Sequence, residues 1–275
     1  PFMKMVKYNF NIDGKNYEFC TDQDVMYGED GVILDKDIDL MQDYSDGFTI
    51  CRLNKSKSER LSRALQEFLK VEISNKTGIK LDNLEHYHKA VNNEVHEKFI
   101  QEFSKGFKVS SLKELKFLDD EISKITSSDV STKSPYDGNS YFWMRIIRPG
   151  ILENNPAHKD VYLDYLRNAV NIYFPICGSS KKSSLSIAPK THKENEQNIL
   201  RTVSGAKVGK RQFTVPAILH INGSLELTRP NPQSDEIMVF SPYLVHGAGI
   251  NEENDITRIS LEMRFWPKNL PVTTR

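Results

Sequence analysis

Residues 235–266, with the sequence DEIMVFSPYLVHGAGINEENDITRISLEMRFW, decide the fold class of this chain. Two runs of strand-forming residues, 236–240 and 256–266, lie on either side of a segment rich in Ser, Pro and Gly turn signals. In the second run, residues 258, 260 and 262 share one face of a strand, because successive side chains point to opposite sides. Short strands that follow one another through turns are typical of an all-β sandwich or barrel.

The same period-two pattern extends backwards from this stretch to residue 140, and no long helix interrupts it. Gly and Pro residues separate the runs, as they do between the strands of compact β-folds. We therefore predict a β-core of the jelly-roll type over residues 136–275, with an insertion at about 193–215. The expected strands lie at 140–148, 168–177, 184–188, 212–221, 224–228, 236–240 and 256–266.

Residues 1–135 have a mixed pattern. Alternation on both sides of Asp13-Gly14 predicts a hairpin over 6–20, and the apolar run at 47–53 predicts a short strand. Apolar residues then recur at helical spacing, which predicts a layer of helices on the outside of the β-core. These helices are expected at 57–75, 82–104 and 111–126, followed by an irregular loop at 127–139. The two parts, 1–135 and 136–275, are expected to form one integrated domain.

The charge composition narrows the classes of function. The 275 residues include 37 Lys and Arg and 37 Asp and Glu, so the formal net charge is zero. This balance argues against a dedicated binder of nucleic acid or anionic membranes, which usually carries a clear positive excess.

No stretch reaches the roughly 18–20 apolar residues of a membrane span, and the N-terminus lacks the apolar core of a secretion signal. Three cysteines without CxxC spacing are typical of free thiols, so we expect a cytoplasmic protein. Composition leaves the oligomeric state open.

The sequence His158-Lys159-Asp160 is a candidate metal site. In an extended segment residues i and i+2 point the same way, so one imidazole and one carboxylate can face the same ion. A second histidine from a distant strand would complete a two-His-one-carboxylate face, which leaves open positions on Fe(II). His246 is the candidate, because it follows an apolar strand and precedes Gly247, which indicates a close backbone approach. The alternative interpretation is a surface His–Asp pair and a separate core histidine.

Arg258 and Ser260 form a second candidate site on the last strand. An arginine fork is the natural partner of a carboxylate, and a hydroxyl group two residues further on can add a hydrogen bond. Arg264, on the same strand, is expected to have a structural role. His192 is expected to fix a turn or to line a cavity without binding metal.

Four segments of the chain resemble the Fe(II)/2-oxoglutarate-dependent dioxygenases, and most of all their phytanoyl-CoA dioxygenase-like subgroup. They occur in the family's order within residues 140–266: HKD at 158–160, LSIAPKTH at 185–192, DEIMVFSPYLVHGAGIN at 235–251 and TRISLEMRF at 257–265. The resemblance implies a mainly β fold, a double-stranded β-helix (jelly-roll or cupin-like) with flanking helices. Lys190 departs from the family, in which a glycine is common at this turn.

Carried over to this sequence, the resemblance implies three Fe(II) ligands, His158, Asp160 and His246. It also implies that 2-oxoglutarate is held through its distal carboxylate by Arg258, with Ser260 as a helper, and elsewhere by Arg145 and Asn171. The implied reaction uses O2 to hydroxylate a small, polar or anionic organic metabolite, with release of succinate and CO2. Because the carboxylate ligand is retained as Asp160, hydroxylation or a related oxidation is expected, and halogenation is not.

Two other classes of function stay open: a jelly roll that uses Zn(II) or Mn(II) for non-oxidative chemistry, and a catalytically silent small-molecule binding module. The interval between His246 and Arg258 favours the oxygenase over both. The role of residues 201–211, RTVSGAKVGKR, is a separate point. This segment carries four cations and no acid. Such an insertion is commonly a solvated loop. It is also a candidate lid for an anionic substrate, formed by Arg201, Lys207, Lys210 and Arg211 with Lys181, Lys182 and Lys190.

Overall fold

A large antiparallel sheet forms the centre of the molecule. The computed structural model describes residues 5–28, 37–106, 112–150, 155–208 and 211–270. The strands of the large sheet follow the order β4-β14-β7-β16-β5, and one further strand, β6, also pairs with β16. Their bounds are β4 Phe48–Arg52, β5 Val130–Ser131, β6 Phe142–Ile147, β7 Val170–Cys177, β14 Glu236–Phe240 and β16 Arg258–Pro267.

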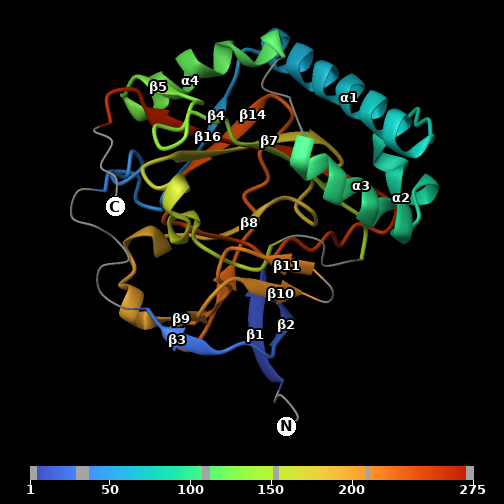
Figure 1. The fold of residues 1–275 in the computed structure, drawn as a ribbon. Coiled ribbons are helices and arrows are strands. Elements are labelled where there is room, and N and C mark those ends of the chain that lie inside the picture. The colour runs from blue at the N-terminus through green and yellow to red at the C-terminus, as the bar shows by residue number, and fades with distance from the viewer. Residues whose placement is uncertain (1–4, 29–36, 107–111, 151–154, 209–210, 271–275) are drawn as a thin grey trace.

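Smaller sheets lie on the opposite side of the molecule from the helices (Figure 1). They have the strand orders β13-β1-β2, β12-β9-β3, β15-β8 and β10-β11. Their bounds are β1 Val6–Ile12, β2 Lys15–Thr21, β3 Val25–Tyr27, β8 Ser186–Ala188, β9 Ile199–Thr202, β10 Ala206–Val208, β11 Arg211–Phe213, β12 Ile218–Ile221, β13 Glu226–Leu227 and β15 Val245–Gly247. The predicted fold class, a jelly-roll β-core with flanking helices, is therefore confirmed.

The helices cover the outer face of the large sheet, where α1 and α4 lie above it and α3 lies to its right in Figure 1. Apolar side chains at alternate positions of β16, from Ile259 to Phe265, pack in one cluster with the buried leucines of α1 (Lys55–Thr77). Burial of apolar surface contributes about 25 cal/mol per Å², so this contact fixes the helical layer on the sheet. The helix begins after Asn54, whose side chain accepts a hydrogen bond from the Lys57 amide, and it ends at a left-handed Gly78.

The helix predicted at 82–104 is wrong in its continuity. A 3₁₀ turn, η1 (Leu84–His86), is followed by α2 (Tyr87–Ala90) and then by α3 (Asn93–Gly106). The chain is extended at Val91 because the Asn92 side chain accepts a hydrogen bond from the Val95 amide and so begins a new helix. Apolar periodicity continues across this break, which is why the pattern alone did not show it.

Two other elements are shorter than expected. The last helix, predicted at 111–126, comprises the 3₁₀ turn η3 (Lys113–Leu115) and α4 (Phe117–Thr126), and its predicted first residue, 111, lies outside the described residues. The strand predicted at 212–221 is divided into β11 and β12, with Pro216 between them. Proline cannot donate a ladder hydrogen bond, so it interrupts the run.

Strands from the N-terminal part pair with strands of the C-terminal part. β1 pairs with β13, β3 with β9, and β4 with β14, so the sheets include residues from both sides of position 135. The hairpin predicted around Asp13-Gly14 is confirmed, with both turn residues at positive φ. The boundary at 135 stays a prediction. Among the described residues, no helix has the length and apolar composition that crossing a membrane requires.

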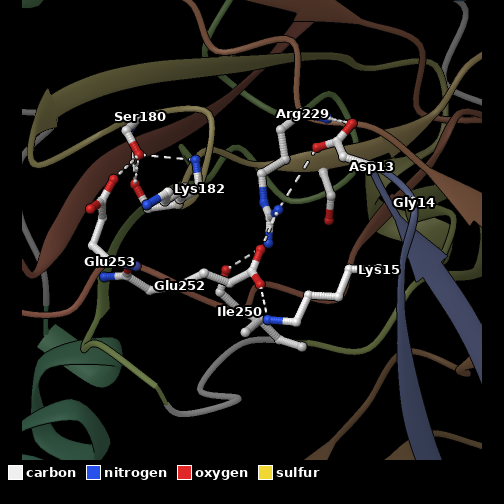
Figure 2. A network of polar contacts seen from close by, with 12 residues as sticks. Asp13, Gly14, Lys15, Ser180, Lys182, Arg229, Ile250, Glu252 and Glu253 are labelled. Carbon is white, nitrogen blue, oxygen red and sulfur yellow. Dashed lines mark hydrogen bonds and ion pairs between the residues drawn. The ribbon is translucent and has the colours of Figure 1, made fainter.

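A polar network joins the first hairpin to the loop that follows β15 (Figure 2). Arg229 donates from Nη1 to Oε2 of Glu252 at 3.0 Å and from Nη2 to the Ile250 carbonyl at 3.0 Å. Lys15 contacts the same carboxylate of Glu252, and Asp13 accepts a hydrogen bond from Thr228. Beside it, Ser180 donates to Glu253 at 2.6 Å. The network therefore fixes the loop 248–253, which connects the strand bearing His246 to β16.

Arg229→Leu tests the contribution of this network to stability. The Arg229 side chain is only 2% exposed, and its removal takes from Glu252 its most buried cationic partner. We expect the free energy of unfolding to fall by about 1–3 kcal/mol. Arg52→Leu is the matched control, because Arg52 also pairs with two carboxylates but is 72% exposed. It should cost no more than about 0.5 kcal/mol. Equal losses in urea denaturation would contradict the assigned role of Arg229.

Candidate metal centre

The inner face of the large sheet carries polar side chains at alternate positions. In the register, Ser260 lies opposite Arg145 of β6, Glu262 lies opposite Trp143, and Arg264 lies opposite Asn171 of β7. Because directly opposed residues point to the same face of a sheet, all of these side chains are directed to the interior, away from the helices. The sheet therefore separates an apolar outer core from a polar interior.

The structure brings together the three predicted metal ligands, which come from separate parts of the chain. The amide of His158 donates to the carbonyl of His246 at 2.9 Å, and the amide of His246 donates to the carbonyl of His158 at 3.0 Å. Oδ1 of Asp160 lies 3.3 Å from Nε2 of His158 and 3.6 Å from Nε2 of His246. All three side chains are buried, and one ligand atom from each lies within 4.8 Å of the others.

Backbone carbonyls fix the orientation of both imidazoles. Nδ1 of His158 lies 2.8 Å from the Pro156 carbonyl, and Nδ1 of His246 lies 2.9 Å from the Leu244 carbonyl. A carbonyl oxygen only accepts, so each Nδ1 carries a proton, and Nε2 is the nitrogen of each ring that faces Asp160. Burial, together with the neighbouring His158, lowers the pKa of His246 to about 4. The ring is therefore neutral near pH 7, as a metal ligand must be.

Asp160 is held by Arg264, the residue that sequence analysis expected to be only structural. Nε and Nη2 of Arg264 both lie 2.7 Å from Oδ2 of Asp160, which leaves Oδ1 for the histidines. Burial by itself raises the pKa of Asp160, but Arg264 and the two histidines outweigh it and hold the pKa well below its usual range. Arg264 also lies over the Trp143 ring, 5.1 Å from its centroid. The sequence held one indication of this role. Arg264 lies an even number of residues after Arg258, so both side chains lie on the same face of β16.

Lys159 points away from the metal site. Its Nζ lies 2.7 Å from Oε1 of Glu196, and Tyr162 donates to the other oxygen of this carboxylate at 2.9 Å. Burial lowers the pKa of Lys159, and Glu196 opposes this effect. Because Lys159 is anchored on one side of the chain, its two neighbours His158 and Asp160 are directed to the other.

Arg258 and Asn171 have buried polar atoms that lack partners. Arg258 is fully buried and donates from Nε to the Ser183 carbonyl at 3.0 Å and from Nη1 to Ser260 Oγ at 2.6 Å. Its Nη2 has no hydrogen-bond partner among the described residues. The two side-chain amide atoms of Asn171, Oδ1 and Nδ2, have none either. An unsatisfied buried polar group costs about 1–3 kcal/mol. The two side chains therefore fit a bound ligand that carries a carboxylate.

Arg145 lies apart from this pair. Its Nε lies 3.1 Å from Oε2 of Glu262, and the Arg145 side chain is 26% exposed, whereas Arg258 is 0% exposed. Arg145 lines a cavity of about 220 Å³ that also reaches His158 and Asp160. Neither Arg258 nor Asn171 lines this cavity. The unpaired groups of Arg258 and Asn171 therefore do not belong to the wall of the cavity that Arg145 lines.

The basic insertion contributes to the cavity, but not through the cations that the sequence singled out. Residues 212–215, at the end of the β10–β11 hairpin, line the cavity. Lys207 is exposed and Arg211 is half-buried, but neither lines it, and Lys210 is outside the described residues. Lys182 lies instead beside the network of Figure 2. The predicted lid therefore has no cation on the described cavity wall.

Two further residues complete the comparison with the sequence. His192 is buried in a 3₁₀ turn, does not line the cavity and is not part of the metal cluster. Lys190 has φ +71°, the left-handed region in which glycine is favoured. Its amide donates to the Asp46 carbonyl at 3.0 Å, so the lysine keeps the turn that a glycine would form.

No protein-family model matches the chain, and no curated protein matches its sequence. Among solved structures, AviO1 from Streptomyces viridochromogenes Tue57 is similar at 14% identity and TM-score 0.49, over 86% of this chain and 96% of that one. EctD from S. alaskensis with 2-oxoglutarate and 5-hydroxyectoine is similar at 11% identity and TM-score 0.49, over 91% and 86%. The epimerase SnoN in complex with Fe3+, alpha ketoglutarate and nogalamycin RO is similar at 8% identity and TM-score 0.42, over 81% and 80%. These similarities concern the fold, so the assignment of the site rests on its own geometry.

Arg264→Gln is expected to weaken the metal site. Without the guanidinium, the pKa of Asp160 rises, because one of the charges that oppose the effect of burial is gone, so protons compete with the metal as the pH falls. We expect the affinity for Fe(II) or Mn(II) to fall about 10- to 100-fold at pH 7, and to fall further at pH 6. Anaerobic calorimetry measures both values. Unchanged affinity at both pH values would show that Arg264 does not support the ligand.

Gly247→Ala tests the close backbone approach beside His246. A Cβ atom at this glycine, which has φ +117°, would lie 2.7 Å from the Pro156 carbonyl oxygen and 3.1 Å from Nδ1 of His158. We expect loss of at least 10-fold in metal affinity, because the histidines must shift. Gly223→Ala is the matched control, since Gly223 has φ +94° but open space around it. Both variants carry backbone strain, so a loss confined to Gly247→Ala identifies the steric contact.

Proposed function

We propose that this protein is an Fe(II)- and 2-oxoglutarate-dependent oxygenase that hydroxylates a small organic metabolite with release of succinate and CO2. One observation carries the proposal. A fully buried arginine with an unpaired Nη2, Arg258, lies in the same interior as two histidines and a carboxylate that converge on one point. A metal site alone would not require this buried cation.

The residues present fit a mononuclear iron site. His158, Asp160 and His246 would hold the metal through two neutral imidazole nitrogens and one carboxylate oxygen, a donor set that suits Fe(II) and leaves positions open. When bound, iron and 2-oxoglutarate supply the oxidising power that takes one oxygen atom of O2 to a C–H bond. Retention of Asp160 supports hydroxylation over halogenation, because a halide needs the ligand position that Asp160 takes.

The chain itself would bind and orient the cosubstrate. Arg258 offers Nη2 to the distal carboxylate of 2-oxoglutarate, and Ser260 holds the guanidinium by the hydrogen bond at 2.6 Å. Asn171, on the neighbouring strand, has both a donor and an acceptor to offer. All three side chains are 0% exposed, so the cosubstrate would be shielded from water, which strengthens each charged contact.

Other parts of the assignment are also proposals. Membership of the phytanoyl-CoA dioxygenase-like subgroup is supported by the order of the four sequence segments. A cytoplasmic location is supported by the three free cysteines, Cys20, Cys51 and Cys177. A non-oxidative Zn(II) or Mn(II) protein and a silent binding module are the competing functions. A metal site alone does not account for the unpaired groups of Arg258 and Asn171, and a binding module does not account for the three metal ligands.

Anaerobic titration with Fe(II) and then 2-oxoglutarate tests the proposal. We expect a metal-to-ligand charge-transfer band in the visible spectrum of the wild-type protein. Arg258→Ala should raise the Kd of 2-oxoglutarate about 100-fold and should leave the Kd of Fe(II) within about threefold. Arg63→Ala, on the exposed face of α1, is the control and should change neither value. Absence of both the band and succinate formation would contradict the oxygenase and favour the other two classes.

A further inference from the structure

Arg145 is the cation in the interior that the binding of 2-oxoglutarate leaves unexplained. It lies on β6 opposite Ser260, and its Nε is taken by Glu262 at 3.1 Å. Its guanidinium lies 5.9 Å from the centre of the Trp143 ring. These two contacts hold the plane of the guanidinium and leave its two Nη groups without a hydrogen-bond partner among the described residues. A fork held in this way is ready to bind a planar anion.

The cavity beside Arg145 has the properties of a substrate site. It reaches His158 and Asp160, and its volume of about 220 Å³ suits a small molecule. Polar and apolar side chains share its wall, and Asn155, Gln212, Thr214 and Arg264 are among the polar members. A concave wall on which polar groups converge beside apolar ones is a usual place for a small ligand. The apolar members are Trp143, Leu163, Tyr165, Leu166, Phe213 and Val215.

The charges around the site indicate the charge of the substrate. Three arginines, at 145, 258 and 264, face two buried carboxylates, Asp160 and Glu262. Burial raises the pKa of Glu262, but Arg145 and Arg264 outweigh it, so this carboxyl group is ionised. The two charges of Fe(II) and the two of 2-oxoglutarate cancel each other. One positive charge is left, which a singly charged anion would balance.

We propose that Arg145 binds the substrate, and that the substrate is a small monoanionic carboxylic acid. The carboxylate pairs with the Nη groups of Arg145, and the rest of the molecule lies in the cavity, beside the metal ligands. A phosphate ester is disfavoured, because it carries about −1.5 to −2 charges at pH 7 and would exceed the single charge available. This inference rests on the proposed function and assigns Arg145 to the substrate and not to the cosubstrate.

The test uses three probes that share one body: 3-phenylpropanoate, its carboxamide, and 2-phenylethyl phosphate. They are titrated by anaerobic calorimetry into the wild-type protein loaded with Fe(II) and saturating 2-oxoglutarate. We expect the carboxylate to bind at least about tenfold more tightly than each of the other two. Arg145→Gln should reduce this preference to within about twofold and leave the Kd of 2-oxoglutarate within about threefold. Arg63→Gln, an exposed arginine of α1, should keep the preference.

A second arm separates this inference from the proposed function. The same titrations use metal-free Arg258→Ala protein with and without Arg145→Gln, so that neither iron nor the cosubstrate anchor contributes. Preference for the carboxylate that depends on Arg145 supports the inference even if 2-oxoglutarate does not bind.

Three results would overturn the inference. The first is absence of carboxylate binding or preference in both arms. The second is tighter binding of the phosphate, which would indicate a site for a dianion. The third is a large increase in the Kd of 2-oxoglutarate for Arg145→Gln with the preference intact, which would return Arg145 to the cosubstrate.

Discussion

Two backbone hydrogen bonds between His158 and His246 are the contact on which the site depends. They join the segment at His158 to β15, a three-residue strand from a distant part of the sequence. The two N···O distances are 2.9 and 3.0 Å. Because backbone groups make this contact, the path of the main chain sets the positions of the two imidazoles. A contact between the two rings is not needed to hold them there. Their Nδ1 protons go to the carbonyls of Pro156 and Leu244, so the tautomers are set by the same two segments. The absence of a side chain at Gly247 allows these segments to meet.

The large sheet supports this contact by separating two environments. Its outer face packs against the helices and buries apolar side chains, which provides most of the driving force for folding. Its inner face carries three arginines and a glutamate. Arg258, Arg264 and Glu262 are buried there, and buried charges cost free energy unless they are paired. Arg264 with Asp160, and Arg145 with Glu262, are paired within the chain. The Nη2 of Arg258 is not. Stability alone does not explain a buried cation that is left partly unsatisfied, whereas a carboxylate ligand does.

Much of this arrangement could be predicted from local patterns. Alternation predicted β16, β7 and β14, and the Asp13-Gly14 pair predicted the first hairpin, because strand and turn preferences act over a few residues. The helix at 82–104 failed because apolar periodicity does not register a cap such as Asn92. Arg264 was misjudged for a different reason. The sequence showed which face of β16 carries Arg264. Its partner Asp160, however, is far away in the sequence, and a local pattern cannot predict a contact between distant residues.

The sequence by itself determined which residue types are available and how they alternate: a His-Lys-Asp segment, a distal histidine before a glycine, and an arginine on a two-sided strand. Alternation is a property of the single chain, because it follows from the geometry of the strand backbone. The tertiary structure alone decided which of these residues meet. It placed Asp160 between two histidines and Arg264, directed Lys159 away from the metal ligands to the buried Glu196, and left Arg145 on a cavity that Arg258 does not line. Pairing between distant strands and the loss of water around buried charges are collective effects, and they exist only once the sheets have closed on each other.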